Sequence, residues 1–572
     1  IDAKGFARTI VSSVVIAVTE TNVENVTVKV SSALTAVEVK GIPPVVETST
    51  NALGDVVTTE QVEALPLVNR NFTQIMTLSA GVIASVTDAA ELGRGSGGQI
   101  PTTEGQGQNV NGARASDINF RMDGVDVNDY DASGFGVPIP NPDTIQEFKV
   151  QTGMYDAEYG RDAGANVTLV TKTGSNALHG DVFEFWRNDV LNANDFFFNQ
   201  NSVPRPELKQ NQFGGTLGGP IIKNKLLFFG SYQGTRQING VSGRQTFYSP
   251  LTSNDRSAAS LGTLFAGQQG LCYIFCPGLP GFGPPIAADG SNINPVALTL
   301  LQMKLPNGQY LFPTANPAND SVSLSVPASF NENQYMGNFD FLQSPKNTIQ
   351  GRFFAAQSNT TNVFAGGGNL PGAPSTDDLN YLVASLTDTY VFKPNLFNQI
   401  RLGYDRISSV TTPHSPFTFS GVGVNTSTQN DNKPSVTIAG SDNFNPGFYF
   451  PFAQDLFNLE DNIAWVRGRH TLRFGGGITR AYLNNRGEEY YGQVNFPSWP
   501  DFLLGMNGAQ NGTAGLTGFP PNGFSNVLYS LEVLGVLAGH ARTWEISAYA
   551  QDDWRIDSRL TLNLGLRWEW LP

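Results

Sequence analysis

The sequence is poor in basic residues and lacks long apolar stretches. Lysine and arginine number 35 against 49 aspartates and glutamates, which gives a formal net charge of −14. This acidic balance argues against a nucleic-acid-binding protein, because phosphates require a basic surface. No uninterrupted apolar stretch of about 18 residues occurs, so the sequence predicts no transmembrane helix.

Cysteine is nearly absent as well. The two cysteines, Cys272 and Cys276, lie in a segment rich in glycine and proline. The pair has no further cysteine or histidine nearby and is therefore a poor zinc site. We expect a local disulfide between them, formed in an oxidising compartment.

Enzyme signatures are also missing. The four histidines are dispersed and form no metal-binding or protease motif. The glycine-rich segment 214–219 lacks the residues of a phosphate-binding loop, and no G-x-S-x-G motif occurs. The sequence therefore predicts no catalytic residue, no metal site and no cofactor. We interpret the glycine-rich segment as a place where a strand packs closely against a neighbouring domain.

Aromatic residues and glycine are abundant instead. The chain has 38 Phe, 17 Tyr and 61 Gly, a composition typical of strands joined by tight turns. Segment 560–570 alternates strictly, with leucine and tryptophan on one face and polar residues, including Arg567 and Glu569, on the other. An apolar exterior opposite a polar lumen is typical of a transmembrane β-barrel, which crosses lipid by alternation.

The same alternation recurs along the second part of the chain. It is found in segments 334–341, 399–405, 471–478 and 545–551. Tight turns are predicted at 393–395, 467–469 and 557–559, each preceded by an aspartate near a strand end. The other connections are long and polar, at 188–210, 237–331, 359–379, 409–454 and 481–542. Short turns on one side and long loops on the other are typical of an outer-membrane barrel.

Residues 140–180 carry two successive patterns. The first has Pro142, Ile145, Phe148, Val150, Gly153 and Tyr159-Gly160, and the second has Gly164-Ala165, Val167, Thr171-Lys172 and Gly174. Together they resemble the end of the plug domain of TonB-dependent outer-membrane receptors. A generic strand–turn–strand of a soluble β protein is the alternative reading.

Two earlier segments resemble other parts of the same plug. Segment 65–82 contains Leu65-Pro66, Arg70-Asn71 and Ala80-Gly81-Val82, although Asn69 stands where related receptors often have glycine. We expect two short helices here, one capped by Thr58 or Thr59 and one by Asn71, with the apolar residues in the plug core. Further on, Asp123-Gly124 predicts a tight hairpin.

The N-terminal residues precede this plug. Residues 1–34 look like the tail of a carboxypeptidase-regulatory-like β-sandwich, with an arbitrary pair of strands as the alternative. In the linker 35–54, the β-prone tetrad Val37, Glu38, Val39 and Lys40 comes before two prolines and could pair with another protein by strand addition. The resemblance implies a TonB box near this place; an ordinary linker is the other interpretation.

Acidic residues follow the hairpin. Asp126, Asn128, Asp129 and Asp131 lack the glycine and spacing of an EF-hand, so no metal is predicted. We expect them in a solvated acidic loop of the plug that, with Arg114, contacts a ligand. Segments 84–108 and 127–140 are the corresponding ligand-contact loops.

The resemblance implies a mainly β protein, with an α+β plug (55–176) inside the lumen of a transmembrane antiparallel barrel (177–572). About eleven strands are expected, roughly half of the 22 in plugged transporters, so we read the chain as a fragment with a partial barrel. The implied function is nutrient import across the outer membrane, with TonB and outer-membrane lipid as partners. A non-transporting adhesin of the same architecture and a soluble secreted β-rich binding protein are the alternatives.

Overall fold

The structure is a computed structural model of the chain. It describes residues 9–12, 37–40, 52–65, 67, 70–83, 109–114, 117–130, 134–136, 138–161, 164–200, 202–241, 243–271, 283–426, 431–515, 521–557 and 559–571. No helix within these residues has both the length and the hydrophobicity needed to cross a membrane.

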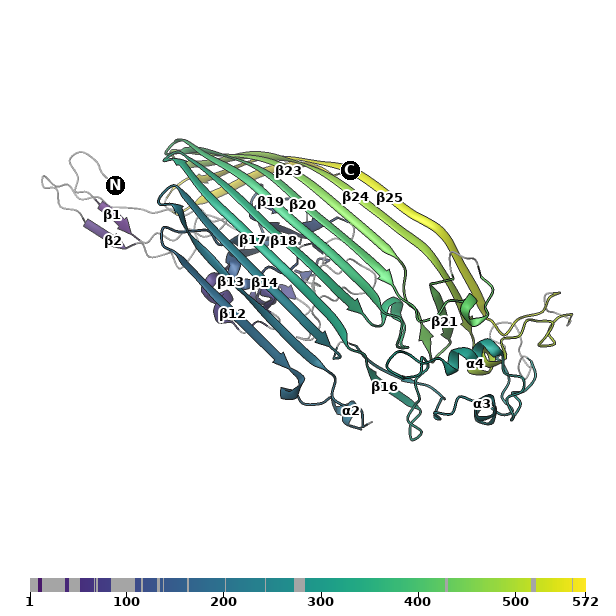
Figure 1. Cartoon of the computed structure of the whole chain (residues 1–572). Coiled ribbons are helices and arrows are strands. Elements are labelled where there is room, and N and C mark those ends of the chain that lie inside the picture. The colour runs from purple at the N-terminus through teal and green to yellow at the C-terminus, as the bar shows by residue number, and fades with distance from the viewer. Residues whose placement is uncertain are drawn as a thin grey trace, which may run out of the picture.

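A large antiparallel sheet forms the wall of the molecule (Figure 1). It has 13 strands, of which β21 (Pro434–Ile438) and β22 (Asn443–Phe444) are short additions beside β24. The remaining eleven, as many as the alternation predicts, are β12 (His179–Asn188), β13 (Leu208–Ile222), β14 (Leu226–Asn239), β17 (Ala328–Ser344), β18 (Asn347–Asn362), β19 (Ser375–Lys393), β20 (Leu396–Pro413), β23 (Phe450–Arg467), β24 (His470–Phe496), β25 (Tyr529–Arg555) and β26 (Thr561–Trp570).

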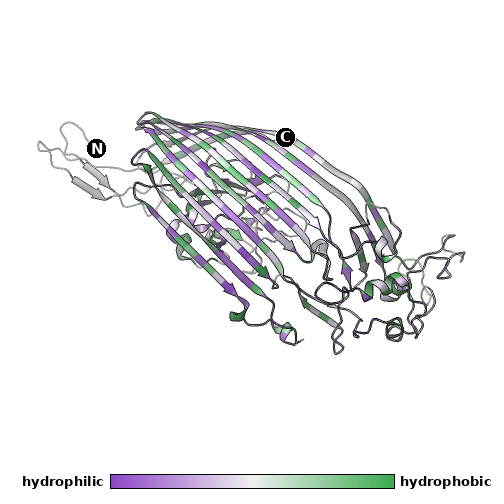
Figure 2. Cartoon of the chain, viewed as in Figure 1, coloured by the Kyte–Doolittle hydropathy of each residue, from purple (hydrophilic) through white to green (hydrophobic). Residues whose placement is uncertain are grey.

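Hydrophobic and hydrophilic residues alternate along most of the wall strands, as the colours of Figure 2 show. On β26 the outward side chains of Leu566 and Trp568 are 76% and 59% exposed. On β17 the polar residues Gln334, Asn338 and Asp340 point inward and are buried. The predicted faces are therefore confirmed, since large apolar side chains that remain exposed are those that lipid covers.

The short turns are also confirmed, and three of them share one side-chain contact. In each, a residue among the first three of the strand after the turn contacts, diagonally, an aspartate of the neighbouring strand. The pairs are Asn347–Asp388, Asn398–Asp461 and His470–Asp552. A slip of one residue would turn these side chains to the opposite face, so the contact fixes the register.

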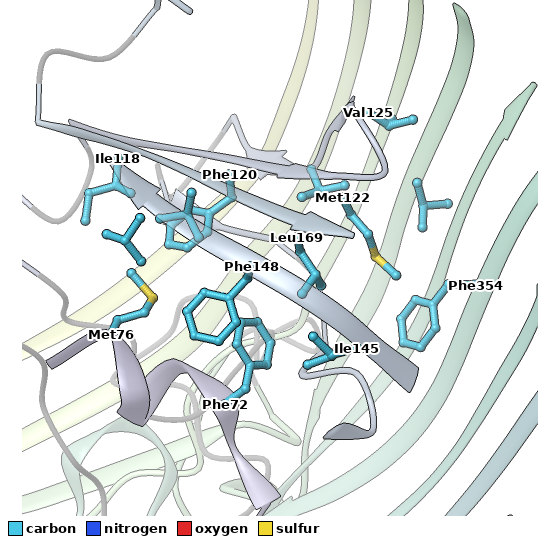
Figure 3. Packing of buried hydrophobic residues seen from close by; sticks show 14 of the residues in the cluster. Phe72, Met76, Ile118, Phe120, Met122, Val125, Ile145, Phe148, Leu169 and Phe354 are labelled. Carbon is cyan, nitrogen blue, oxygen red and sulfur yellow. The ribbon is translucent and has the colours of Figure 1, made fainter. Parts of the chain in front are cut away.

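The plug is a separate five-stranded sheet on the concave side of the wall. Its strand order is β3 (Leu53–Thr58), β10 (Ile145–Gly153), β11 (Ala165–Thr171), β6 (Ile118–Met122) and β7 (Val125–Asp126). Phe72 packs on Phe148 with ring centroids 5.2 Å apart. Figure 3 shows this core and Phe354 of β18 beside it, so one hydrophobic cluster joins plug and wall.

Strand β11 differs from its prediction in one respect. Its alternation indicates a half-buried strand, yet Asn166 and Thr168 are buried along with Val167 and Leu169. The apolar face packs in the plug core, and the sheet lies inside the curve of the wall. The wall covers the second face of β11. The alternation therefore marks one face with apolar contacts and one with polar contacts, and neither face is exposed to water.

Both predicted plug helices form. Thr58 precedes α1 (Thr59–Ala64), and its backbone N–H donates to Gln61 Oε1. Asn71 caps η2 (Phe72–Leu78) by accepting from the backbone N–H of Thr73, although η2 is a 3₁₀-helix. The tighter winding turns Leu78 outward to 70% exposure, so the prediction of Leu78 as a core residue is wrong.

The prediction of polar, solvated long loops is also wrong in part. Four connections, 240–327, 363–374, 414–449 and 497–528, contribute to a second hydrophobic core. We call this unit the outer-loop domain; it contains α3 (Ala258–Leu264), α4 (Pro295–Gln302), α5 (Trp499–Leu504), β21 and β22. Trp499 stacks on Phe265, and Phe312 packs on Phe502.

The remaining elements are short. They are β1 (Thr9–Ser12) paired in parallel with β2 (Val37–Lys40), β4 (Val82–Ile83) with β5 (Asn109–Val110), β8 (Asn128–Asp129) with β9 (Gly134–Phe135), β15 (Arg244–Tyr248) with β16 (Ser321–Ser325), η4 (Pro142–Thr144), η5 (Asp189–Leu191), α2 (Phe196–Gln200), η6 (Ala365–Gly367) and η7 (Ser420–Val422). Of the expected β-sandwich tail at 1–34, only 9–12 lie within the described residues, so that assignment stays a prediction.

Candidate functional site: the plug against the barrel wall

An arginine–glutamate–arginine cluster joins the plug to the wall. Arg121 of β6 places Nη2 2.6 Å from Glu460 Oε1, on β23. Arg401 of β20 places Nη1 3.1 Å from Glu460 Oε2 and 3.5 Å from the backbone oxygen of Gly124. One wall carboxylate therefore forms ion pairs with a plug cation and a wall cation, so that each buried charge has a partner.

A second cluster surrounds Arg161 of the plug. Its guanidinium lies 3.7 Å from the centre of the Tyr130 ring and 3.5 Å from Asp126 Oδ2. Its backbone N–H donates to Glu569 of β26 at 3.0 Å, and the Tyr130 hydroxyl donates to Glu545 of β25 at 2.8 Å. The cluster thus ties one plug segment to the last two wall strands.

A third cluster is centred on Arg473 of β24. Its two terminal nitrogens lie 2.8 Å from Asp156 of the plug and 2.6 Å from Asp553 of β25. Gln551 donates to Asp156 at 2.7 Å and accepts from the backbone N–H of Ala157 at the same distance. Polar contacts therefore hold the plug along much of the wall.

A cavity of about 420 Å³ lies between the plug hairpin and the wall. Its lining includes Arg121, Asp123, Arg352, Arg401 and Glu460, and the lining residues on the wall lie in the half nearer the short turns. The volume matches that of small-molecule pockets. Its charged lining indicates a wet space beside the plug.

Burial raises the pKa of two carboxyl groups in the plug. Desolvation raises the pKa of Asp123, although the hairpin aspartate accepts from the backbone N–H and hydroxyl of Thr171. Desolvation also raises the pKa of Glu158, against the opposing effect of Arg473. Both carboxyls are held in place by the closed plug, because only the packed interface removes them from water.

Glycine allows the plug and the wall to approach closely. A side chain at Gly403 of β20 would begin 3.0 Å from both methyls of Val125. Gly124, with φ of +83°, faces the Arg401 guanidinium and takes the left-handed conformation of the predicted hairpin. The predicted close packing of segment 214–219 against the plug is not observed, since the nearest atoms there belong to β12 and β14.

The predicted ligand residues lie in different places. Asp126, Asn128 and Asp129 are buried between plug and wall, with exposures of 8%, 3% and 2%, so the expected solvated acidic loop is wrong for them. Asp126 accepts from the backbone N–H and from the side-chain amide of Asn128, which is a structural role in this conformation. Arg114 is exposed, and Asp131 lies outside the described residues.

The other predicted sites are only partly described. The tetrad Val37–Lys40 forms β2 and pairs in parallel with β1. Figure 1 places this pair at the end of the wall that carries the short turns. Cys272 and Cys276 lie outside the described residues, so the disulfide stays a prediction.

Sequence reasoning missed the ion-pair clusters and a polar centre in the outer-loop domain. There, buried Asp501 of α5 accepts from the Asn526 amide, the Leu271 backbone N–H and the Ser498 hydroxyl. Inward-facing Arg401 and Glu569 were visible as polar positions in alternating strands, but their plug partners are hundreds of residues away. Alternation identifies a face and does not identify its partner.

Comparisons with known proteins agree with this architecture. Residues 170–572 match the family described as outer membrane beta barrel domain, and residues 47–167 match the TonB-dependent receptor plug domain. The TonB-dependent transporter Oar of Myxococcus xanthus is 29% identical over 216 residues, which are 36% of this chain and 19% of Oar.

Among solved structures, the chain is similar to outer-membrane proteins of two bacteria. The outer membrane transporter YddB from Escherichia coli has a TM-score of 0.54 at 11% identity, over 91% of this chain and 58% of that protein. A mutant of the ferric enterobactin receptor PfeA from Pseudomonas aeruginosa has a TM-score of 0.47 at 15% identity, over 91% and 57%. The chain thus spans a little over half of these transporters. With a matching plug, a matching wall and polar contacts between them, the chain belongs to the non-enzymatic TonB-dependent receptors and transporters of the outer membrane.

Proposed function

We propose that this protein imports a scarce nutrient across the outer membrane, with energy transmitted by TonB. The main support for this proposal is the chemistry of the plug–wall interface, where the Glu460, Arg161 and Arg473 clusters form ion pairs. Water can replace such contacts at a small net cost, whereas it cannot replace apolar contacts. These contacts therefore favour release of the plug, which must also separate the hydrophobic cluster that it shares with the wall.

The cavity beside the plug hairpin supports the same proposal. It gives Asp123 and Gly124 space toward the short-turn end, and cations of plug and wall line it. A plug that shifts or partly unfolds toward that end would open a passage along β20 and β23. An anionic or polar solute fits such a lining better than an apolar one.

TonB would act on β2. Its strand pairs with β1 along one edge, and strand addition needs one further edge. Pulling on Val37–Lys40 would be transmitted through the linker to β3, the edge strand of the plug sheet. The position of β3 at the edge of the plug sheet supports a pull that acts on the edge of the plug and not on its centre.

Photo-crosslinking tests the TonB contact. A benzophenone side chain at Glu38 should crosslink to TonB in cells, whereas one at Lys346, on a short turn of the wall, should not. Val39→Pro removes a backbone donor and should abolish both the Glu38 crosslink and uptake at an unchanged membrane level. Uptake that continues without any Glu38 crosslink would contradict the proposed TonB site.

The substrate class is open to a growth test. A deletion strain should grow more slowly on one member of a panel of scarce iron chelates, oligosaccharides, peptides and cobalamins. Growth should return with the wild-type chain and not with Val39→Pro. Normal growth of the deletion strain on the whole panel would favour the second candidate function.

A non-transporting adhesin or structural surface protein is that second candidate. The outer-loop domain favours it, since its core of aromatic side chains gives a rigid surface outside the barrel. Such a protein would keep cell attachment or surface integrity with Val39→Pro in place. An importer would lose its function with the same variant.

A further inference from the structure

Three arginines face outward from the wall near its loop end. They are Arg406 of β20, Arg480 of β24 and Arg542 of β25, and they lie in a row with aromatic side chains of neighbouring strands. Arg406 is neutralised by Asp455 at 2.6 Å. Within the described residues, Arg480 and Arg542 form no ion pair, so this row is positive on a chain whose net charge is −14.

The aromatic rings hold the two free cations in place. The Arg480 guanidinium lies 4.6 Å from the centre of the Trp544 ring and 5.0 Å from that of Tyr482. Arg542 lies 5.0 Å from the same Tyr482 ring and donates to the Asn484 amide oxygen at 2.8 Å. Two guanidinium groups therefore flank one tyrosine, and Arg542 also donates to the backbone oxygens of Leu483 and Ala541.

The height of the row matches the outer edge of the hydrocarbon layer. Outward positions of β24 between the turn and Arg480 are apolar: Leu472, Phe474, Gly476 and Ile478. Ten residues separate His470 from Arg480, a rise of about 25 Å for a strand tilted by roughly 40°. Lipid-facing bands of such barrels are about 25 Å tall, so Arg480 lies where head groups begin.

An apolar groove lies directly beneath the arginines. It has a volume of about 670 Å³ and runs over β19, β20, β23, β24 and β25. Arg480 and Trp544 line its upper part, and exposed Leu386, Leu402, Phe457 and Leu459 line the rest. A groove of this kind suits an acyl chain, and the cations above it suit a phosphate.

We propose that this row and groove bind one lipid of the outer leaflet whose head group carries phosphate. The phosphate contacts Arg480 and Arg542, and one acyl chain lies in the groove across β20 and β23. Arginine is suited to this contact because its planar fork donates two parallel hydrogen bonds to phosphate oxygens. The occupant is a lipid and not free phosphate, since the groove adds an apolar seat that inorganic phosphate cannot use.

Native mass spectrometry of the purified protein in detergent micelles tests the proposal, with phosphorylated lipid A and its dephosphorylated form as probes. Wild-type protein should bind the phosphorylated form more tightly. Arg480→Gln with Arg542→Gln should lower that affinity by about tenfold or more, the effect expected from losing charged hydrogen bonds. Inorganic phosphate should not displace the lipid.

A matched control comes from another part of the wall. Lys209 of β13 and Arg236 of β14 also face outward, and Arg236 lies ten residues from the turn residue Leu226, as Arg480 does from His470. Lys209→Gln with Arg236→Gln removes the same charge and should leave lipid binding unchanged. Arg480→Lys with Arg542→Lys keeps the charge and should retain most of the affinity, which guards against misfolding of the glutamine variant.

The proposal would be overturned by equal binding of the phosphorylated and dephosphorylated lipids. Unchanged affinity in the Arg480/Arg542 glutamine variant, or an equal loss of affinity in the Lys209/Arg236 control, would overturn it too. Displacement by inorganic phosphate would also overturn it, because the site would then be an anion site without a lipid seat.

Discussion

The plug and the outer-loop domain are both folded units carried by one wall, but different contacts hold them. Charged side chains, together with one shared hydrophobic cluster, join the plug to the wall. Aromatic side chains from four connections hold the outer-loop domain together. Ionic contacts can be exchanged for water and apolar contacts cannot. The comparison teaches that the plug is held partly by contacts that water can replace, whereas the core of the outer-loop domain is held by contacts that water cannot replace.

The largest effect should come from the apolar unit. Phe502→Ala removes a buried ring that contacts Phe312, Phe496 and Trp499, and should destabilise the outer-loop domain by about 3–5 kcal/mol. Limited proteolysis should then cut connections 240–327 and 497–528 while the wall stays folded on semi-native gels. Unchanged protease resistance would show that this core does not hold the domain together.

The next effect should come from the ionic unit. Glu460→Gln leaves Arg121 and Arg401 without their shared carboxylate, and should weaken plug docking by about 3 kcal/mol. Hydrogen exchange of β11 amides should then speed up by about 100-fold. The matched control is Asp461→Asn, the next residue on β23, whose side chain pairs with Asn398 of the wall. Equal acceleration in both variants would contradict a specific role for Glu460.

A smaller effect is the pH dependence of stability, which we expect in the outer-loop domain. Burial raises the pKa of Asp442, in the outer-loop domain, to about 7. Because its folded pKa exceeds the unfolded one, the folded state binds the proton more tightly and stability falls as pH rises. Between about pH 6 and pH 8 the loss should be about 1.4 kcal/mol.

Thermal unfolding monitored by proteolysis of the outer-loop domain measures this slope. Asp442→Asn should flatten it. Asp289→Asn serves as the control in another connection of the same domain, because hydrogen bonds from Ser291 lower the pKa of exposed Asp289 and give it no such slope. A slope that persists in Asp442→Asn would assign the pH dependence to another group.

The smallest effect should come from the close approach of wall and plug. Gly403→Ala places a methyl 3.0 Å from Val125 and should cost about 1 kcal/mol of plug docking. Gly337→Ala on β17 meets no atom within 4 Å and should be neutral. Hydrogen exchange at the hairpin compares the two variants. Equal protection in both would show that the plug adjusts without loss.

The sequence predicted the wall well because alternation is a local signal. Gln334, Asn338 and Leu566 each lie on the expected face, and the turns at 393–395 and 467–469 form as expected. Asp123-Gly124 and Asn71 likewise act through neighbours a few residues away. Such features depend on backbone conformation, which short sequence patterns describe.

The missed features all depend on partners far along the chain. Asp126 and Asp129 look like loop residues, yet the wall covers them. Leu251 and Leu504 belong to one core although more than two hundred residues separate them in sequence. No periodicity within either connection indicates this contact. The burial of Asp126 and Asp129 could therefore not be predicted from composition, because it depends on wall residues that are distant in sequence.

The distance in sequence between the paired charges sets an order for assembly. Arg121 can pair only after Glu460 has been made, 339 residues later. Arg161 likewise contacts Glu569, which is 408 residues later in the chain. During export the plug emerges first, with its cations still hydrated and no carboxylate to receive them. Docking of the plug must therefore follow the synthesis of β23, β25 and β26, which supply these carboxylates.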